Sequence, residues 1–392
     1  MNNFEINMKT RVIFGKDTHL NVGAEVRKYA DSCLIVDDGM PFLKPLTDVV
    51  KASLEENGVK WYEFSEITPN PPLTTCRRAM EMIKANGIGF VLAIGGGSTM
   101  DAGKFIASQV TTEENLINMS YGWQPEVLVP LPHACISTLS GTGSEADGCA
   151  MIVDDTVNPP IKHMVWSLRM CCDFAIINPE LTYTLPKKQT AAGGMDIMSH
   201  CWETYMVENP NEDLSDYFLA GIVKTVLKYV PICLEDPTNY QARANLCLSA
   251  NACMNPSFMY SGSANYWICH AMENPITTQF HGTHGQTLGY ITLAYVRYCY
   301  EHNINTTKLI KWAVECMGAE YDFFEPARTI LAGADNLEAW LKKVGLATRL
   351  SEVGIDYEKD NDQLRLCAEA CVNAGTCRFS VDEVMDIYAL VK

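Results

Sequence analysis

The pattern of apolar residues changes near Pro186, and this change constrains the fold more than any other feature of the sequence. Before it, short apolar runs that predict strands alternate with stretches that predict helices. The strand candidates are 32–38, 60–65, 89–98, 131–138, 149–155 and 174–181, with helices at 42–57 and 73–86 and another starting at Thr99. This alternation predicts a parallel sheet that is covered by helices on both faces.

After "LPKKQT" (185–190) the sequence predicts helices only. They are expected at 190–207, 214–234, 239–255, 263–275, 284–301, 306–317, 326–345, 361–374 and 380–391. We therefore expect an α/β domain over residues 1–185 and an all-helical domain over residues 186–392.

Charge and cysteine content limit the partners and the compartment. The net charge of −17 argues against nucleic acid and anionic membranes, which both attract basic surfaces. Sixteen cysteines occur without any Cys-x-x-Cys spacing, and most lie in apolar runs, as is typical of free thiols in a reducing compartment. We find neither a signal peptide nor an apolar stretch of 18 residues, so a cytoplasmic protein without a membrane partner is expected.

A glycine-rich turn, "LAIGGGSTMDAGK" (92–104), joins a predicted strand to a predicted helix. Gly95, Gly96 and Gly97 allow the backbone to approach a ligand closely. Ser98 is expected to cap the helix, whose free N–H groups would then face an anion such as a pyrophosphate. The alternative is a tight turn without a ligand.

A second loop, "STLSGTGSEAD" (137–147), also follows a predicted strand. Its glycines alternate with hydroxyl side chains, including Thr138 and Thr142, and such a loop can bind a sugar, an amide or phosphate oxygens. On its own it is also consistent with a polar turn. Two glycine loops at strand ends of one sheet fit a dinucleotide that lies across the carboxyl ends of the strands.

A candidate metal site begins in "GGMDIMSHCWETYM" (193–206), where Asp196 and His200 are four residues apart on a predicted helix. Taken alone, this pair is also consistent with a core histidine that is hydrogen-bonded to a carboxylate. His270 and His284 would complete a set of one carboxylate and three imidazoles, which suits Zn²⁺ or Fe²⁺. His281 can orient a ligand, line the substrate cleft or replace His284 as the ligand.

With these motifs the whole chain resembles the iron-containing (group III) alcohol dehydrogenases, in particular the branch of butanol dehydrogenases and broad-range aldehyde reductases. The motifs that carry the resemblance are "RVIFGK", "GGGSTMDAGK", "TLSGTGSE", "NPELTYTLPKKQTAAGGMDIMSHCWETY", "CHAMEN", "HGTHGQ" and "DEVMDIYALV". The resemblance implies a Rossmann-like dinucleotide-binding domain followed by an all-α metal-binding domain, as in the dehydroquinate synthase-like fold.

The resemblance also implies roles for single residues. Thirteen residues separate the third and fourth ligands in this family, and this spacing selects His284 over His281. Asn274 stands where many members have a second histidine, near the nicotinamide and the substrate. The implied dinucleotide contacts are Gly95, Gly96, Gly97, Ser98, Asp101, Lys104, Thr138 and Thr142.

Asp38 implies a preference for NAD over NADP. By the family's alignment it lies at the strand end that faces the adenine ribose, where NADP-preferring relatives have glycines. A carboxylate there accepts hydrogen bonds from ribose hydroxyls and repels a 2′-phosphate. The alternative is that Asp37 and Asp38 only cap a turn.

The expected function is therefore the interconversion of primary alcohols and aldehydes by hydride transfer, with small-molecule substrates and a homo-oligomeric enzyme. His281 and Asn274 are the candidates for proton transfer and substrate contact. The alternatives are a lyase or cyclase of the dehydroquinate synthase type, or a catalytically weak nucleotide-binding homologue. The first needs a cluster of lysines and arginines near the ligands, and the ligand segments contain none.

Overall fold

The computed structural model describes residues 9–158, 160–207, 211–255, 267–374 and 377–392. The contacts within the chain form two compact units, and the division falls after Tyr183. The first unit contains all the strands of the described residues, and the second, Thr184–Lys392, contains helices. The predicted combination of an α/β part and an all-helical part is confirmed.

The first unit is built on a six-stranded sheet in which every pair of neighbours is parallel. In chain order the strands are β1 (Arg11–Phe14), β2 (Ser32–Val36), β3 (Lys60–Phe64), β4 (Val91–Gly95), β5 (His133–Ser137) and β8 (Phe174–Ile177). Their order in the sheet is β1-β8-β5-β4-β2-β3. The carboxyl ends of β5, β4 and β2 are therefore neighbours at one edge of the sheet.

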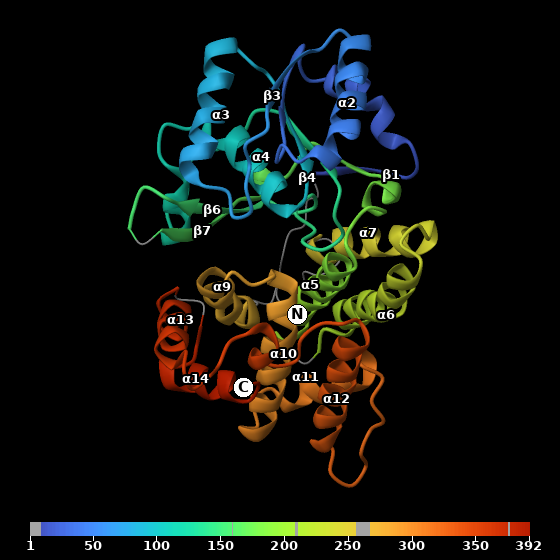
Figure 1. The fold of residues 1–392 in the computed structure, drawn as a ribbon, viewed down its shortest axis with the longest axis vertical. Helices are drawn as coiled ribbons and strands as arrows, with labels where there is room; N and C mark the ends of the chain where they lie inside the picture. Colours follow the sequence, from blue (N-terminus) through green and yellow to red (C-terminus); the bar gives the residue numbers. More distant parts are fainter. Residues whose placement is uncertain (1–8, 159, 208–210, 256–266, 375–376) are drawn as a thin grey trace. The chain divides into compact units, whose positions relative to one another are not determined.

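Helices cover both faces of this sheet because successive residues of each strand point to opposite sides. In β2, Cys33 and Ile35 pack with α1 (Val22–Val26) and α2 (Lys44–Glu56). The alternate residues of the same strand pack with α3 (Leu73–Asn86) and α4 (Gly97–Gln109). In Figure 1, α2 and α3 lie on opposite sides of the strands.

One predicted strand lies outside the parallel sheet. The run at 149–155 forms β6 (Cys149–Asp154), which pairs in an antiparallel hairpin with β7 (Ile161–Trp166). His163 was expected to lie in a strand segment, but no bounds could be given for β7, because "IKHMVW" has apolar residues on both of its faces and lacks a clear alternation. Ile152 and Val165 bury the inner face of the hairpin against α3 and α4.

The second unit consists of helices around one apolar core. They are α5 (Lys187–Tyr205), α6 (Asp213–Glu235), α7 (Tyr240–Met254), α9 (Ile268–Phe280), α10 (His284–Glu301), α11 (Thr306–Glu315), α12 (Arg328–Lys343), α13 (Asn361–Asn373) and α14 (Val381–Ala389). Among the predicted helices, the one expected at 263–275 has bounds that differ most from the structure. Residues 263–266 lie outside the described residues, and α9 continues past Pro275 to Phe280.

Within the described residues, α6 is long and apolar enough to cross a membrane, judged by length and composition alone. The sequence reading had found no such stretch. A single helix of this kind is weak evidence for a membrane span, and α6 packs against α5 and α7 of the same unit. It also buries Asp216, which forms ion pairs with Lys308 and Lys311.

A glycine sets the distance between α5 and α10. A Cβ atom at Gly285 would lie 2.0 Å from the carbonyl oxygen of Ala192 in α5, so only glycine fits at this position. Gly285 directly follows His284, and Ala192 lies one turn before Asp196. The close contact of the two helices therefore also sets the distance between two of the candidate ligands.

We predict that Gly285→Ala lowers the free energy of unfolding by about 1–3 kcal/mol, because the added methyl group pushes α10 away from α5. Gly221→Ala in α6 is the matched control, since a Cβ atom there would meet nothing within 4 Å. That substitution is expected to be neutral or to stabilise the protein by up to about 1 kcal/mol. Chemical denaturation measures the free energy of unfolding of both variants. Equal changes in Gly285→Ala and Gly221→Ala would contradict the proposed packing constraint.

Candidate functional site

Helix α5 carries the first two candidate ligands on one buried face. Every residue of α5 from Thr190 to Tyr205 is buried, so Asp196 and His200 lie inside the helical unit, 4% and 6% exposed. His200 Nε2 lies 3.7 Å from Asp196 Oδ1. Burial lowers the pKa of His200 to about 3, so its ring is neutral at pH 7, which is the form that binds metal ions.

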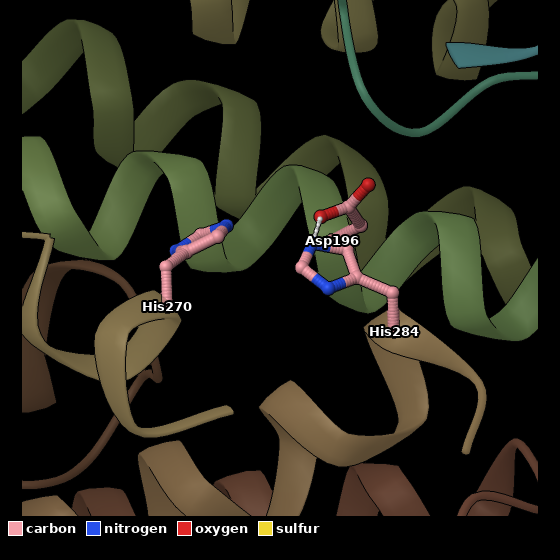
Figure 2. A group of neighbouring side chains, drawn as sticks. All are labelled: Asp196, His270 and His284. Atoms are coloured by element: carbon pink, nitrogen blue, oxygen red, sulfur yellow. Dashed lines mark ion pairs between the residues drawn. The ribbon is translucent and has the colours of Figure 1, made fainter. Parts of the chain in front are cut away.

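His270 and His284 come from α9 and α10 and face the same place (Figure 2). His284 Nε2 lies 3.5 Å from Asp196 Oδ1. One ligand atom from each of Asp196, His270 and His284 lies within 4.8 Å of the other two, so a single cation can contact all three. His200 is not in this group of three, although its ring stacks on that of His270 with centroids 5.0 Å apart.

Two buried atoms of this cluster have no hydrogen-bond partner among the described residues: Asp196 Oδ1 and His270 Nε2. A buried polar atom without a partner costs free energy, and such atoms are rare in folded proteins. Both atom types are common ligands of Zn²⁺ and Fe²⁺. The cluster therefore fits a divalent transition metal, as the sequence predicted.

Asn274 and His281 both lie between His270 and His284 in the sequence. His281 adopts a left-handed backbone conformation, with φ of 51°, in the short connection between α9 and α10. It lines a cavity of about 430 Å³ together with Lys188, Thr283 and Gln286. Asn274 lies one turn after His270 in α9 and is partly exposed. Their predicted catalytic roles stay predictions.

Sequence reasoning missed two buried glutamates. Glu203 Oε1 lies 3.1 Å from His270 Nδ1, and Glu273 Oε2 lies 2.6 Å from His284 Nδ1. Glu203 and His270 are 67 positions apart, so no local pattern links them. Glu273 lies one helical turn from His270, but its partner is His284 on the next helix, so helical spacing does not indicate this contact either.

In the first unit, the predicted dinucleotide loops lie side by side. The Gly95 carbonyl oxygen accepts a hydrogen bond from the Thr138 N–H group at 3.0 Å. A Cβ atom at Gly97 would lie 2.6 Å from Thr142 Cγ2. Since β4 and β5 are neighbours, the loops that follow them form one continuous surface at the carboxyl edge of the sheet.

Ser98 does not cap α4, which corrects the sequence reading. The helix begins at Gly97 with Gly96 in the capping position, so Ser98 lies inside the first turn. The reason is that β4 ends at Gly95, and the chain enters the helix directly from this residue. The Ser98 hydroxyl instead accepts a hydrogen bond from the Asn70 N–H group at 3.3 Å.

A buried network joins α4 to the second loop. The Lys104 ammonium donates to the Ser144 carbonyl oxygen at 2.8 Å and to Asp147 at 2.6 Å. Asp101 accepts from the Ser144 hydroxyl at 2.6 Å and from the Met151 N–H group at 3.1 Å. Burial on its own would lower the pKa of Lys104, because it disfavours the charged form. The negative charges of Asp147 and Asp101 favour the charged form more strongly, so the pKa of this side chain is raised. The predicted contact of Asp101 with the dinucleotide stays a prediction.

Two aspartates follow β2 at the same edge of the sheet. Asp37 is buried and accepts a hydrogen bond from the Gly39 N–H group at 2.9 Å. Burial raises the pKa of Asp37. Asp38 is partly exposed, and its Oδ1 accepts from the Met40 N–H group at 3.0 Å. Both aspartates thus cap a turn, and the hydrogen bond from Met40 uses one of the two carboxylate oxygens of Asp38.

Two family models match the chain along almost its whole length. One, described as iron-containing alcohol dehydrogenase, matches residues 9–179. The other, described as the C-terminal part of the Fe-containing alcohol dehydrogenase family, matches residues 190–391. The chain belongs to the iron-containing alcohol dehydrogenase family.

Individual relatives agree with the predicted branch of this family. NADH-dependent butanol dehydrogenase B of Clostridium acetobutylicum is 33% identical over 362 residues, which are 92% of this chain and 91% of that protein. NADPH-dependent aldehyde reductase YqhD of Escherichia coli is 29% identical over 91% of this chain and 90% of its own length. The crystal structure of NADH-dependent butanol dehydrogenase A from Thermotoga maritima matches with a TM-score of 0.90 and 29% identity, covering 100% of this chain and 99% of that one.

For this iron-containing alcohol dehydrogenase we predict that Lys104→Met destabilises the protein by about 3–5 kcal/mol, because Asp147 and Asp101 lose their buried counter-ion. Lys44→Met is the matched control, since Lys44 pairs with Asp48 on the exposed surface of α2. That substitution should leave the unfolding midpoint unchanged. Urea denaturation tests the pair, and a stable Lys104→Met protein would refute the role of the network.

Proposed function

We propose that this protein interconverts primary alcohols and aldehydes by hydride transfer, with a divalent metal in the helical unit and NAD(H) as the preferred dinucleotide. The proposal rests on two buried atoms that have no hydrogen-bond partner in the described part of the chain, Asp196 Oδ1 and His270 Nε2, together with the nearby His284 Nε2. Membership in the iron-containing alcohol dehydrogenase family supports the same reaction class. The substrates are small molecules.

Asp196, His200, His270 and His284 would hold the metal, Fe²⁺ or Zn²⁺. When bound, the ion supplies a Lewis acid for the substrate oxygen. One carboxylate and three neutral imidazoles leave the ion a net positive charge, so it attracts the oxygen of an aldehyde or alcohol. His200, which stacks on His270 outside the group of three, would join the set by a small shift of its ring.

The carboxyl edge of the sheet would hold the dinucleotide, which supplies or accepts the hydride. Gly96 and Gly97 allow the pyrophosphate to approach the first turn of α4, where free N–H groups attract anions. Thr138 and Thr142 line the adjoining loop. Asp38 would bind the adenine ribose with the carboxylate oxygen that does not accept from Met40.

Asn274 and His281 would act at the substrate. Asn274 carries an amide where many family members have an imidazole, so it can position a substrate oxygen but cannot exchange a proton near pH 7. His281 can exchange a proton, and it lines a cavity. Proton transfer to the product oxygen would then use His281 or solvent.

A lyase or cyclase of the dehydroquinate synthase type finds no comparable support. The relatives described above are alcohol dehydrogenases and an aldehyde reductase. A catalytically weak nucleotide-binding homologue is also disfavoured, because one carboxylate and two imidazoles, those of Asp196, His270 and His284, converge in the helical unit.

The proposed function is tested by loading the purified protein separately with Zn²⁺ and Fe²⁺ and assaying butanal reduction with NADH. We predict that Asp196→Ala, His270→Ala and His284→Ala lose both bound metal and nearly all turnover, because the remaining ligands hold the ion weakly. Metal analysis after dialysis and initial rates measure the two effects.

His281→Ala is the matched control for His284→Ala. It removes an imidazole three residues away but is expected to keep the metal. A His284→Ala protein with full metal content and normal turnover would contradict the proposed site. Loss of metal in His281→Ala alone would make His281 the ligand.

For the dinucleotide, we predict a higher kcat/KM with NADH than with NADPH. Asp38→Gly should narrow or invert this preference by ~1–3 kcal/mol, the size of an interaction with a charged group, because it removes the carboxylate that repels a 2′-phosphate. Metal content should not change. Asp48→Gly, on the exposed surface of α2, is the control. A wild-type enzyme that prefers NADPH would overturn the assignment.

A further inference from the structure

Two buried carboxylates contact the Nδ1 atoms of His270 and His284, two histidines of the candidate metal site. Glu203 is 4% exposed and Glu273 is fully buried. Neither belongs to the set of four candidate ligands. Burying a carboxylate is costly unless it is paired and hydrogen-bonded, so each of these side chains needs a physical reason for its position.

Glu203 holds both the backbone and the ring of His270. Its Oε1 accepts a hydrogen bond from the His270 backbone N–H group at 2.9 Å and lies 3.1 Å from His270 Nδ1. His270 is the third residue of α9, where backbone N–H groups have no partner within the helix. A single carboxylate oxygen from α5 thus caps the start of α9 and sets the orientation of its imidazole.

Glu273 contacts the ring of His284 but not its backbone. Its Oε2 lies 2.6 Å from His284 Nδ1, and its Oε1 accepts a hydrogen bond from the Thr277 hydroxyl one turn further along α9. Thr277 therefore fixes the carboxylate. In this way α5 orients the imidazole of α9, and α9 orients the imidazole at the start of α10.

Both contacts engage Nδ1 and leave Nε2 for the metal. An imidazole that donates its Nδ1–H to a carboxylate presents a lone pair on Nε2. His270 Nε2 has no hydrogen-bond partner among the described residues, and His284 Nε2 faces Asp196. His200 differs, since its Nδ1 lies 3.8 Å from the Cys253 thiol, a much weaker partner.

We propose that Glu203 and Glu273 are positioning residues that fix the ring orientation and tautomer of His270 and His284 for metal binding. The inference rests on the proposed metal-dependent function. It predicts that the two glutamates determine metal affinity although neither contacts the ion.

The test measures metal affinity and ligand geometry in the full-length protein. Zn²⁺ dissociation constants are determined by competition with a chromophoric chelator, and the visible spectrum of the Co²⁺-loaded protein reports the coordination geometry. We expect Glu203→Leu and Glu273→Leu to weaken Zn²⁺ binding by about 10- to 100-fold and to change the Co²⁺ spectrum. Glu203→Gln and Glu273→Gln keep an acceptor oxygen and the side-chain shape, so they should restore part of the affinity.

Asp216→Asn is the matched control. Asp216 is a buried carboxylate in the same helical unit, but it pairs with Lys308 and Lys311 instead of a histidine. This variant should lose thermal stability and keep the metal affinity and Co²⁺ spectrum of the wild type. The glutamine variants serve as the test if the leucine variants do not fold.

The outcomes separate this inference from the proposed function. If His270→Ala loses the metal while all glutamate variants keep wild-type affinity and spectrum, the positioning role is wrong and the metal site stands. If the wild-type protein binds neither Zn²⁺ nor Co²⁺, the proposed function fails and this inference fails with it. If Asp216→Asn weakens metal binding as much as the glutamate variants do, the effect is general destabilisation and the positioning role is also refuted.

Discussion

The helical unit depends on the burial of charged and polar side chains around α5. Asp196 and Glu203 lie on this helix among apolar residues, and both face imidazoles from other helices. In water these groups would be fully solvated, so their burial opposes folding unless hydrogen bonds and a cation replace the lost solvent. The close contact between α5 and α10 at Gly285 brings the groups within ligand distance. A metal ion at the proposed site would therefore also stabilise the folded state of this unit.

The sequence predicted those parts of the fold and site that depend on local spacing. Alternating strands and helices predicted the covered parallel sheet, and a four-residue spacing placed Asp196 and His200 on one face of α5. The thirteen residues between His270 and His284 span the rest of α9 and a connection of three residues. This spacing came from the family resemblance, because the residues alone left His281 as an alternative.

Other parts depend on contacts that no local pattern records. Glu203 meets His270 only because α5 and α9 pack together, and nothing in either segment indicates the partner. The hairpin strand β7 lacks a clear alternation, so its pairing with β6 decides its conformation. Ser98 was expected to cap a helix starting at Thr99, but β4 ends at Gly95 and α4 begins two residues earlier, at Gly97.

His284 is the first residue of α10, and this has an electrostatic consequence for the site. The aligned peptide dipoles of this helix place a partial positive charge at its first turn. That charge opposes a cation bound next to His284, and the carboxylates of Asp196 and Glu273 offset it. The same helix end favours a negatively charged oxygen over a neutral one. At the proposed site, the start of α10 would therefore favour an oxyanion over a neutral oxygen beside His284.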